Sequence, residues 1–363
     1  MASEPTSEQI ATGEFVRVDG AALREQMARL FVALRVSEGH ASIASDILVA
    51  SDLRGVDTHG VVTGLRYLEQ IEAGLIDPTV TPRLVRESAG SAVVSNAGGL
   101  GVVGAHTAMR VAIEKARANG IGHVGVVDGR HIGMVGYYPM MAAAQDMIGM
   151  AVTNANRSVR PARGADPRFG TNPIAFAAPA GEERPFVLDM ATSTVASGKV
   201  RRAHALGLPI PRGWAVDADG QPLETPPGAR DTSWALTPVG ESADGEGVNY
   251  KGYGLAVMVD ILAGVLAGGG SSADLDYGSN MSWFMAIDIG QMRPIEAFKA
   301  DMDRLIRYLG ETRPSDPTRP VILAGDPEAD AFEYRSKVGV PLHRDTLATL
   351  RSRAQALGTP SLV

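Results

Sequence analysis

Residues 91–128 alternate between β-like and helical texture around a glycine-rich loop. SAVVSN has the short apolar pattern of a strand, GLGVVG follows at residues 99–104, and a helical stretch then ends at a glycine. A second strand-like run, IGHVGVVD, ends in Asp128, about where a dinucleotide-binding unit has its ribose-binding carboxylate. The pattern predicts a strand–helix–strand unit. One interpretation is a Rossmann-type nucleotide site at Gly99–Gly104, although glycine spacing alone is also typical of a tightly packed turn.

Helical periodicity dominates both ends of the chain. AALREQMARLFVALRV near the N-terminus and IEAFKADMDRLIRYLG after Pro294 place apolar residues on one helical face. Between them, short β-like runs such as IGMAVT and FVLDM are separated by glycine turns. We expect an α+β fold in which residues 1–80 with 294–363 form a helical domain and residues 81–293 form a β-rich domain.

Composition argues against several classes of protein. The 363 residues include 34 Lys and Arg against 41 Asp and Glu, and the net charge of −7 disfavours nucleic acid as a bulk electrostatic partner. No cysteine is present, which excludes disulfides and thiolate zinc sites, and we predict no metal site. The N-terminal run lacks the apolar core of a signal peptide, and the most apolar segment is interrupted by Asp260 and glycines. We expect a cytoplasmic protein without membrane contact.

Two histidines lie in motifs that suit chemistry. DLRGVDTHG, residues 52–60, puts His59 in the first turn of a helix, where it is either a capping residue or a general acid or base. A helix N-terminus disfavours imidazolium, so a catalytic histidine there needs a nearby carboxylate. GRHIGMVGYYP has His131 close to glycines that let the backbone approach a ligand.

Two further motifs carry charged or hydroxyl side chains. FVLDMATSTVASGK reads as a strand ending near Asp189, which is either an ion-pair partner or a functional carboxylate. Thr192 and Ser193 follow and can cap a helix or donate to phosphate. Lys251 comes just before a glycine-rich helix start, which suits an anionic ligand, while a solvated lysine is the alternative.

Taken in chain order, these motifs resemble the malate/L-lactate dehydrogenase family, the group without a Rossmann fold. The resemblance rests on DLRGVDTHG, the GYY after His131, GTNP, DMATS and KGYGL, and it runs from about Leu23 to the C-terminal GDPEADAFEYRSKVGVPL. The family also contains ureidoglycolate dehydrogenase, 2,3-diketo-gulonate reductase, sulfolactate dehydrogenase and cyclic imino acid reductases. It implies a largely antiparallel, non-Rossmann NAD(P)-binding domain and a homodimer with the active site near the interface. The glycines of GLGVVG would then serve a turn and close packing.

The resemblance also implies a reaction, in which hydride passes between NAD or NADP and C2 of a small acidic 2-hydroxy or 2-oxo acid, or a cyclic imino acid. We expect His59 to move the proton, with Asp189 stabilising its imidazolium, and His131 is the alternative acid or base. The positions implied for cofactor binding are Asn154, Asn172, Val187, Leu188, Met190, Ala191, Thr192, Ser193, Lys251, Gly252, Gly325 and Asp326.

The sequence departs from the family pattern around the expected substrate site. Thr58 replaces the usual serine, and Thr63 stands where the family usually has the arginine that grips the substrate carboxylate. We hypothesise that the anion grip has moved to Arg130, beside His131, or to the Arg157–Arg163 cluster, and we set Arg66 aside as lying on a neighbouring helix face. Two alternatives stay open: an uncharged or larger substrate, and a non-catalytic nucleotide-binding relative.

Overall fold

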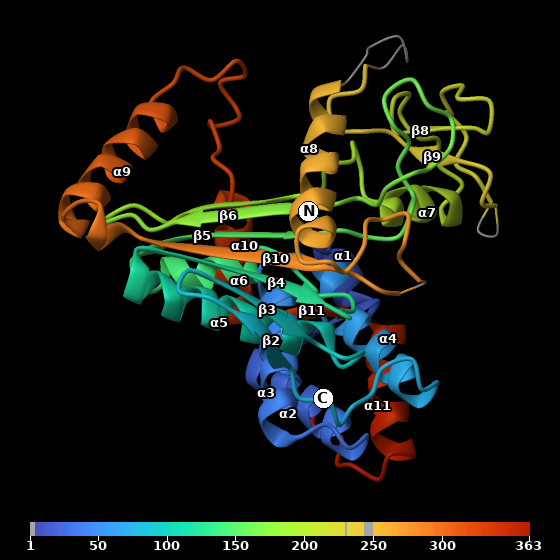
Figure 1. The fold of residues 1–363 in the computed structure, drawn as a ribbon. Coiled ribbons are helices and arrows are strands. Elements are labelled where there is room, and N and C mark those ends of the chain that lie inside the picture. The colour runs from blue at the N-terminus through green and yellow to red at the C-terminus, as the bar shows by residue number, and fades with distance from the viewer. Residues whose placement is uncertain (1–3, 229–230, 243–249, 277) are drawn as a thin grey trace.

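A mixed β-sheet forms the centre of the fold (Figure 1). The computed structural model describes residues 4–228, 231–242, 250–276 and 278–363. Within these residues the sheet has seven strands in the order β2-β3-β4-β10-β5-β6-β7. The strands are β2 (Arg83–Glu87), β3 (Ser91–Ser95), β4 (Ile121–Val127), β5 (Met147–Thr153), β6 (Ile174–Ala178), β7 (Phe186–Met190) and β10 (Ser282–Asp288). Only β3 and β4 pair in parallel, so the expected α+β class with a largely antiparallel sheet is confirmed.

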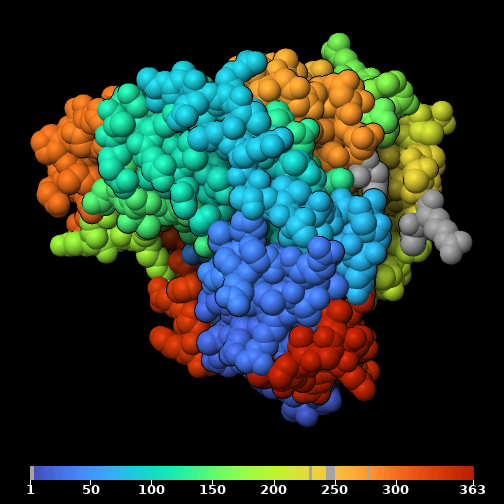
Figure 2. Space-filling view, turned by 60° about the horizontal axis from the view of Figure 1, so that its bottom comes forward, coloured from blue at the N-terminus to red at the C-terminus, as the bar shows by residue number. Residues whose placement is uncertain are grey.

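Helices from both chain ends pack together on one side of the sheet. They are α2 (Gly20–Ala33), α3 (Glu38–Leu53), α4 (Val61–Glu72), α10 (Asp326–Val338) and α11 (Arg344–Ala356), with the shorter α1 (Ser7–Ala11) beside them. A two-stranded sheet of β1 (Phe15–Val18) and β11 (Val340–His343) joins the ends directly. In Figure 2 the blue N-terminal helices and the red C-terminal helix form one continuous lobe. The buried faces of α2 and α3 share one apolar core with the sheet helices.

Helix α9 (Ile295–Gly310) lies away from this lobe, at one edge of the molecule (Figures 1 and 2). The carboxylate of Asp303 accepts hydrogen bonds of 2.9–3.1 Å from the amides of Gly181, Glu182 and Glu183 in the β6–β7 turn. This helix, which we expected in the helical domain, is therefore attached to the sheet. The domain boundaries themselves stay a prediction.

The parallel pair β3–β4 is the predicted strand–helix–strand unit, joined by α5 (Gly101–Asn119). A Cβ added at Gly101 would lie 2.3 Å from the carbonyl oxygen of Arg130 and 2.4 Å from that of His131. One added at Gly104 would lie 2.5 Å from Oδ1 of Asn96. The first turn of α5 is thus in close contact with the loop that contains Arg130 and His131, and its glycines permit this close packing.

Asp128 directly follows β4, at the ends of the parallel strands where α5 begins. Its carboxylate accepts a hydrogen bond from the Ser95 hydroxyl at 2.8 Å, and its carbonyl accepts one from the Gly98 amide at 3.0 Å. Both bonds join the ends of neighbouring strands. The Rossmann interpretation is wrong, because the remaining strands are antiparallel and protein carbonyls fill the helix start where a pyrophosphate would bind.

A smaller packed unit lies beyond the opposite face of the sheet (Figure 1). It contains α7 (Ser197–Ala205), β8 (Ala215–Val216), β9 (Ala235–Leu236) and part of α8 (Tyr250–Asp260), whereas the π-helical η2 (Ile261–Val265) packs against the sheet. The remaining elements are η1 (Asp57–His59), α6 (Tyr137–Ala143) and η3 (Ile289–Gln291). Among the described helices, none is both long and apolar enough to cross a bilayer.

Candidate active site

The fold brings His59 and His131 together. His59 ends η1, just before α4, and His131 lies in the loop between β4 and α6. Their rings are stacked, with centroids 5.5 Å apart and an interplanar angle of 21°. Both residues are half-buried. The two candidates for the acid or base therefore belong to one site.

Hydrogen bonds hold one edge of each imidazole. The Thr58 hydroxyl lies 2.9 Å from Nδ1 of His59. The Tyr67 hydroxyl, on α4, lies 2.7 Å from Nδ1 of His131 and 3.0 Å from the carbonyl oxygen of that residue. Within the described residues the protein bonds both rings through Nδ1, so each keeps Nε2 for another molecule.

Burial keeps both imidazoles neutral near neutral pH. Desolvation, with a smaller contribution from the positive charge of Arg66, lowers the pKa of His59 to about 4. Burial also lowers the pKa of His131 well below its ordinary value, with smaller effects from His59 and Arg66. A neutral imidazole is ready to accept a proton, as a general base must be.

Asp189 lies at the edge of the same site, near the end of β7. Its carboxylate accepts a hydrogen bond from the Gly136 amide at 2.7 Å. Although the residue keeps exposed surface, desolvation of the carboxyl group raises its pKa to about 6; Glu328 adds to the rise, whereas the Gly136 bond and Arg54 oppose it. Among the described contacts none joins Asp189 to His59. The pairing that favoured His59 over His131 therefore gains no support from this geometry.

Two arginines bring positive charge to the site. Arg54, the half-buried arginine of DLRG, interacts electrostatically with Asp189 and Glu328. Arg66 is exposed on α4 and acts on both histidines and on Tyr67. Arg66, set aside above as a substrate ligand, therefore acts on the ionisation of both histidines. Arg54 was missed, although it stands in the motif that drew attention to His59.

Thr63, which replaces the family's arginine, turns inward. It is buried, and its hydroxyl donates to the carbonyl of Thr58 at 2.8 Å. Thr63 therefore stabilises the turn that contains Thr58 and His59. In the proposed arginine cluster, Arg160 is buried and pairs with the buried Glu241 at 3.4 Å, so its charge is already balanced. Arg130 is half-buried beside His131, and its role in binding stays a prediction.

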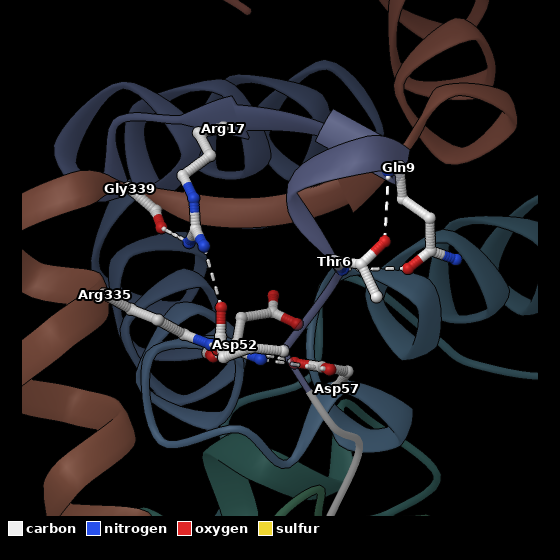
Figure 3. A network of polar contacts seen from close by, with 8 residues as sticks. Thr6, Gln9, Arg17, Asp52, Asp57, Arg335 and Gly339 are labelled. Carbon is white, nitrogen blue, oxygen red and sulfur yellow. Dashed lines mark hydrogen bonds and ion pairs between the residues drawn. The ribbon is translucent and has the colours of Figure 1, made fainter. Parts of the chain in front are cut away.

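A polar network around Arg335 includes Asp57, the first residue of the turn η1 that ends at His59 (Figure 3). Arg335 of α10 is only 1% exposed and donates to the carboxylate of Asp57 and to the carbonyl of Asp52. The buried Asp52 carboxylate accepts from the Val61 amide at 2.8 Å, and burial raises its pKa. A Cβ at Gly60 would lie 1.8 Å from that carboxylate, so the glycine after His59 is required for close packing.

Comparison with known proteins agrees with this geometry. A profile of the family described as malate/L-lactate dehydrogenase matches residues 18–351. The chain belongs to this family. Malate dehydrogenase from Pyrococcus horikoshii is 37% identical over 353 residues, covering 96% of this chain and 97% of the relative. Malate/(S)-sulfolactate dehydrogenase from Methanothermus fervidus is 34% identical over 347 residues, covering 92% and 96%. The solved structure of the Pyrococcus horikoshii malate dehydrogenase superposes with a TM-score of 0.86 at 35% identity, covering 96% of this chain and 97% of that one.

As a member of the malate/L-lactate dehydrogenase family, the chain is an oxidoreductase. The positions implied above for cofactor binding lie mainly in two groups. In the first, the Val187 amide lies 3.4 Å from the Ala324 carbonyl, and a Cβ at Gly325 would lie 2.8 Å from the Val187 carbonyl oxygen. Strand β7 leads from this contact to Asp189. A hollow of about 570 Å³ adjoins Phe186 and Asp326.

The second group surrounds the start of α8. Lys251 is exposed there, and Gly252 packs against the carbonyl of Val239, whose amide donates to Thr192 at 2.8 Å. An exposed lysine at the start of a helix suits the binding of an anionic pyrophosphate, because the side chain and the helix N-terminus are both positive. Half-buried Leu188, Met190 and Ala191 offer apolar surface between the two groups. The residues present thus fit a nicotinamide dinucleotide.

Several implied cofactor residues bond to protein instead. Asn154 bonds to Asp260 at 3.0 Å, and Asn172 donates to the Ala256 carbonyl at 3.0 Å. The hydroxyls of the buried Thr192 and Ser193 donate to backbone carbonyls. The hydroxyl and amide groups of these four side chains therefore hydrogen-bond to the protein itself and stabilise the backbone around the site.

Proposed function

We propose that this enzyme uses NAD or NADP to oxidise the C2 hydroxyl of a small 2-hydroxy acid to the 2-oxo acid. The observation that carries the proposal is the stacked pair of neutral imidazoles within electrostatic reach of Arg66. A neutral histidine takes up the hydroxyl proton, and an arginine holds the substrate carboxylate.

The bound cofactor supplies the hydride acceptor. The protein orients the hydroxyl and receives its proton at Nε2 of His59, the free ring nitrogen of a residue whose Nδ1 faces Thr58. The C2–H bond electrons leave as hydride while the O–H proton passes to the imidazole, so the oxidation is balanced. Half-burial of both rings limits competition from water.

The substrate we favour carries two anionic groups. Malate and sulfolactate, the acids in the names of the relatives above, each have two. Arg66 offers one cationic group within electrostatic reach of the histidines and Arg54 offers a second near Asp189, and a charge-assisted hydrogen bond contributes about 1.5–3 kcal/mol. Thr63 then needs no substitute arginine elsewhere, because Arg66 lies within electrostatic reach of the reacting groups.

A substrate panel tests the proposal. Purified protein is assayed with NAD⁺ and NADP⁺ against malate, sulfolactate and lactate, and in reverse against oxaloacetate, pyruvate and a cyclic imino acid. We expect kcat/KM for malate or sulfolactate to exceed that for lactate by about tenfold or more, as one additional ion pair of roughly 1.4 kcal/mol gives. Reduction of the imino acid alone, with no hydroxy acid oxidised, would contradict the proposal.

We further propose a cytoplasmic homodimer. The cysteine-free sequence fits a reducing compartment. Apolar side chains stay exposed on α9, where Leu305 is 49% and Tyr308 74% exposed, and such surface commonly packs against another subunit.

A further inference from the structure

Two hydrogen-bonding groups reach Nδ1 of His131, and one of them is a backbone amide. The Gly133 amide donates to this nitrogen at 3.3 Å, and the Tyr67 hydroxyl lies 2.7 Å from it and 3.0 Å from the carbonyl oxygen of His131. Gly133 has φ +69°, a conformation that favours glycine. A backbone amide always carries its hydrogen, so the nitrogen it reaches acts as an acceptor.

Tyr67 reinforces this arrangement. It is 1% exposed, and burial raises the pKa of its hydroxyl, so the hydroxyl keeps its proton. With Nδ1 held as an acceptor, the hydrogen of a neutral His131 lies on Nε2, the free edge. Protonating Nδ1 would set its hydrogen against that of the Gly133 amide, so the Tyr67 hydroxyl is left to donate to this nitrogen.

His59 differs in this respect. Among the described contacts its Nδ1 meets the hydroxyl of Thr58, an exposed residue, and no backbone amide, and a hydroxyl can accept as well as donate. An Nδ1–H on His59 is therefore tolerated both in the neutral ring and in the imidazolium. The two stacked rings have different protonation chemistry although they are the same residue type.

We propose that Tyr67, together with the Gly133 amide, is a positioning residue that fixes His131 as the Nε2–H tautomer. His131 then donates a constant hydrogen bond to the substrate oxygen, and His59 alone exchanges the proton. The inference rests on the proposed function for the identity of that oxygen. During oxidation the O–H proton moves to Nε2 of His59 and hydride leaves C2, while His131 keeps its own hydrogen.

The tautomer can be read directly in the unliganded protein. Long-range ¹H–¹⁵N spectra of histidine-labelled enzyme distinguish protonated from unprotonated ring nitrogens. We expect Nδ1 of His131 to be unprotonated and Nε2 protonated in the wild type. A protonated Nδ1 in the wild type would overturn the proposal, and because no substrate is present, this result is independent of which acid the enzyme oxidises.

Tyr67→Phe tests the positioning role. We expect a mixture of His131 tautomers and a kcat lower by about 10- to 100-fold, below the full cost of losing an oxyanion donor. Tyr138→Phe is the matched control, because that buried tyrosine donates to the Ile132 carbonyl at 2.5 Å and not to the ring. Unchanged tautomers and unchanged kcat in Tyr67→Phe would contradict the role.

A second pair of variants covers the case in which Tyr67→Phe does not fold. His131→Gln keeps an N–H donor at the ring position, whereas His59→Gln removes the proton acceptor. We expect kcat of His131→Gln to be about tenfold or more higher than kcat of His59→Gln, since general acid–base catalysis contributes about 10²–10⁴-fold. The reverse order would assign the proton to His131 and overturn the proposal.

Discussion

At the residue scale, desolvation has the largest effect on the ionisation of His59, His131 and Asp189. It lowers the pKa of each histidine and raises that of the carboxylic acid. In all three it disfavours the charged form. Both histidines are consequently held in the neutral form that a general base requires.

Arg66 is the charge that depresses the pKa of His59 beyond the effect of burial. Replacing it with glutamine removes a repulsive cation from the imidazolium, so we expect the pKa of His59 to rise from about 4 toward its ordinary value. An NMR titration of the His59 ring measures this shift. Arg110→Gln, an exposed arginine on α5, is the control and should leave the titration unchanged. A His59 titration that stays in place in Arg66→Gln would refute the assignment.

Asp189 should make stability depend on pH. Its folded pKa of about 6 lies above the ordinary 3.8, so its ionisation opposes folding. The protonated Asp189 carboxyl group makes its full contribution to folding stability at pH values below the pKa of the unfolded state. This contribution is lost as pH rises through the folded pKa of about 6. Asp189→Asn should therefore raise Tm relative to wild type at about pH 8 and lose this advantage near pH 4. Thermal unfolding at both pH values is the measurement, and a wild type that is the more stable protein at the higher pH would contradict the raised pKa.

The sequence could single out some site residues and not others. His59, His131 and Asp189 stand beside glycines or in motifs that make a polar residue conspicuous. Tyr67 lies within an amphipathic helix and reads as core, because its partner is distant in the chain. Its role depends on the packing of α4 beside the His131 loop, which no local pattern encodes.

At the element scale, local texture predicted β3, α5 and β4 but not their neighbours in the sheet. The parallel pairing of β3 and β4 follows from one helical crossover, whereas the insertion of β10 between β4 and β5 joins residues far apart in the chain. The same glycine spacing fits a phosphate loop and a packed helix start. Only the position of the Arg130 and His131 carbonyls decides between them.

Gly101 gives this distinction a test. Gly101→Ala would press a methyl group onto the carbonyls of Arg130 and His131, so we expect a loss of about 1–3 kcal/mol in unfolding free energy and a lower kcat. The dissociation constant for NAD(P) should stay unchanged. Gly39→Ala, a helical glycine with open space around its Cα, is the control for both measurements. A selective loss of cofactor affinity in Gly101→Ala would contradict the packing role and would indicate that a nucleotide binds at the start of α5.

At the scale of the whole molecule, α9 and the lobe of chain-end helices lie on different parts of the surface (Figure 2). Amphipathic periodicity identified α9 as a helix but could not assign its neighbours, since Asp303 finds its partners in a turn more than a hundred residues earlier. The small unit around α7, β8 and β9 also has its own apolar core, built from residues scattered between Val159 and Ala256.

The exposed apolar side chains of α9 make the oligomeric state measurable at this scale. We expect light scattering at micromolar concentration to give about twice the mass of the 38.0 kDa chain. Activity and mass are followed together as the protein is diluted. A fully active monomer would rule out the proposed homodimer.

In the proposed reaction His59 exchanges the proton that accompanies hydride transfer. A direct test compares kcat and the cofactor dissociation constant of His59→Ala with those of the wild type, using the best acid from the substrate panel. We expect a loss of about 10²–10⁴-fold or more in kcat, with cofactor affinity and Tm little changed. Near-normal turnover in His59→Ala would contradict it and transfer the proton to His131.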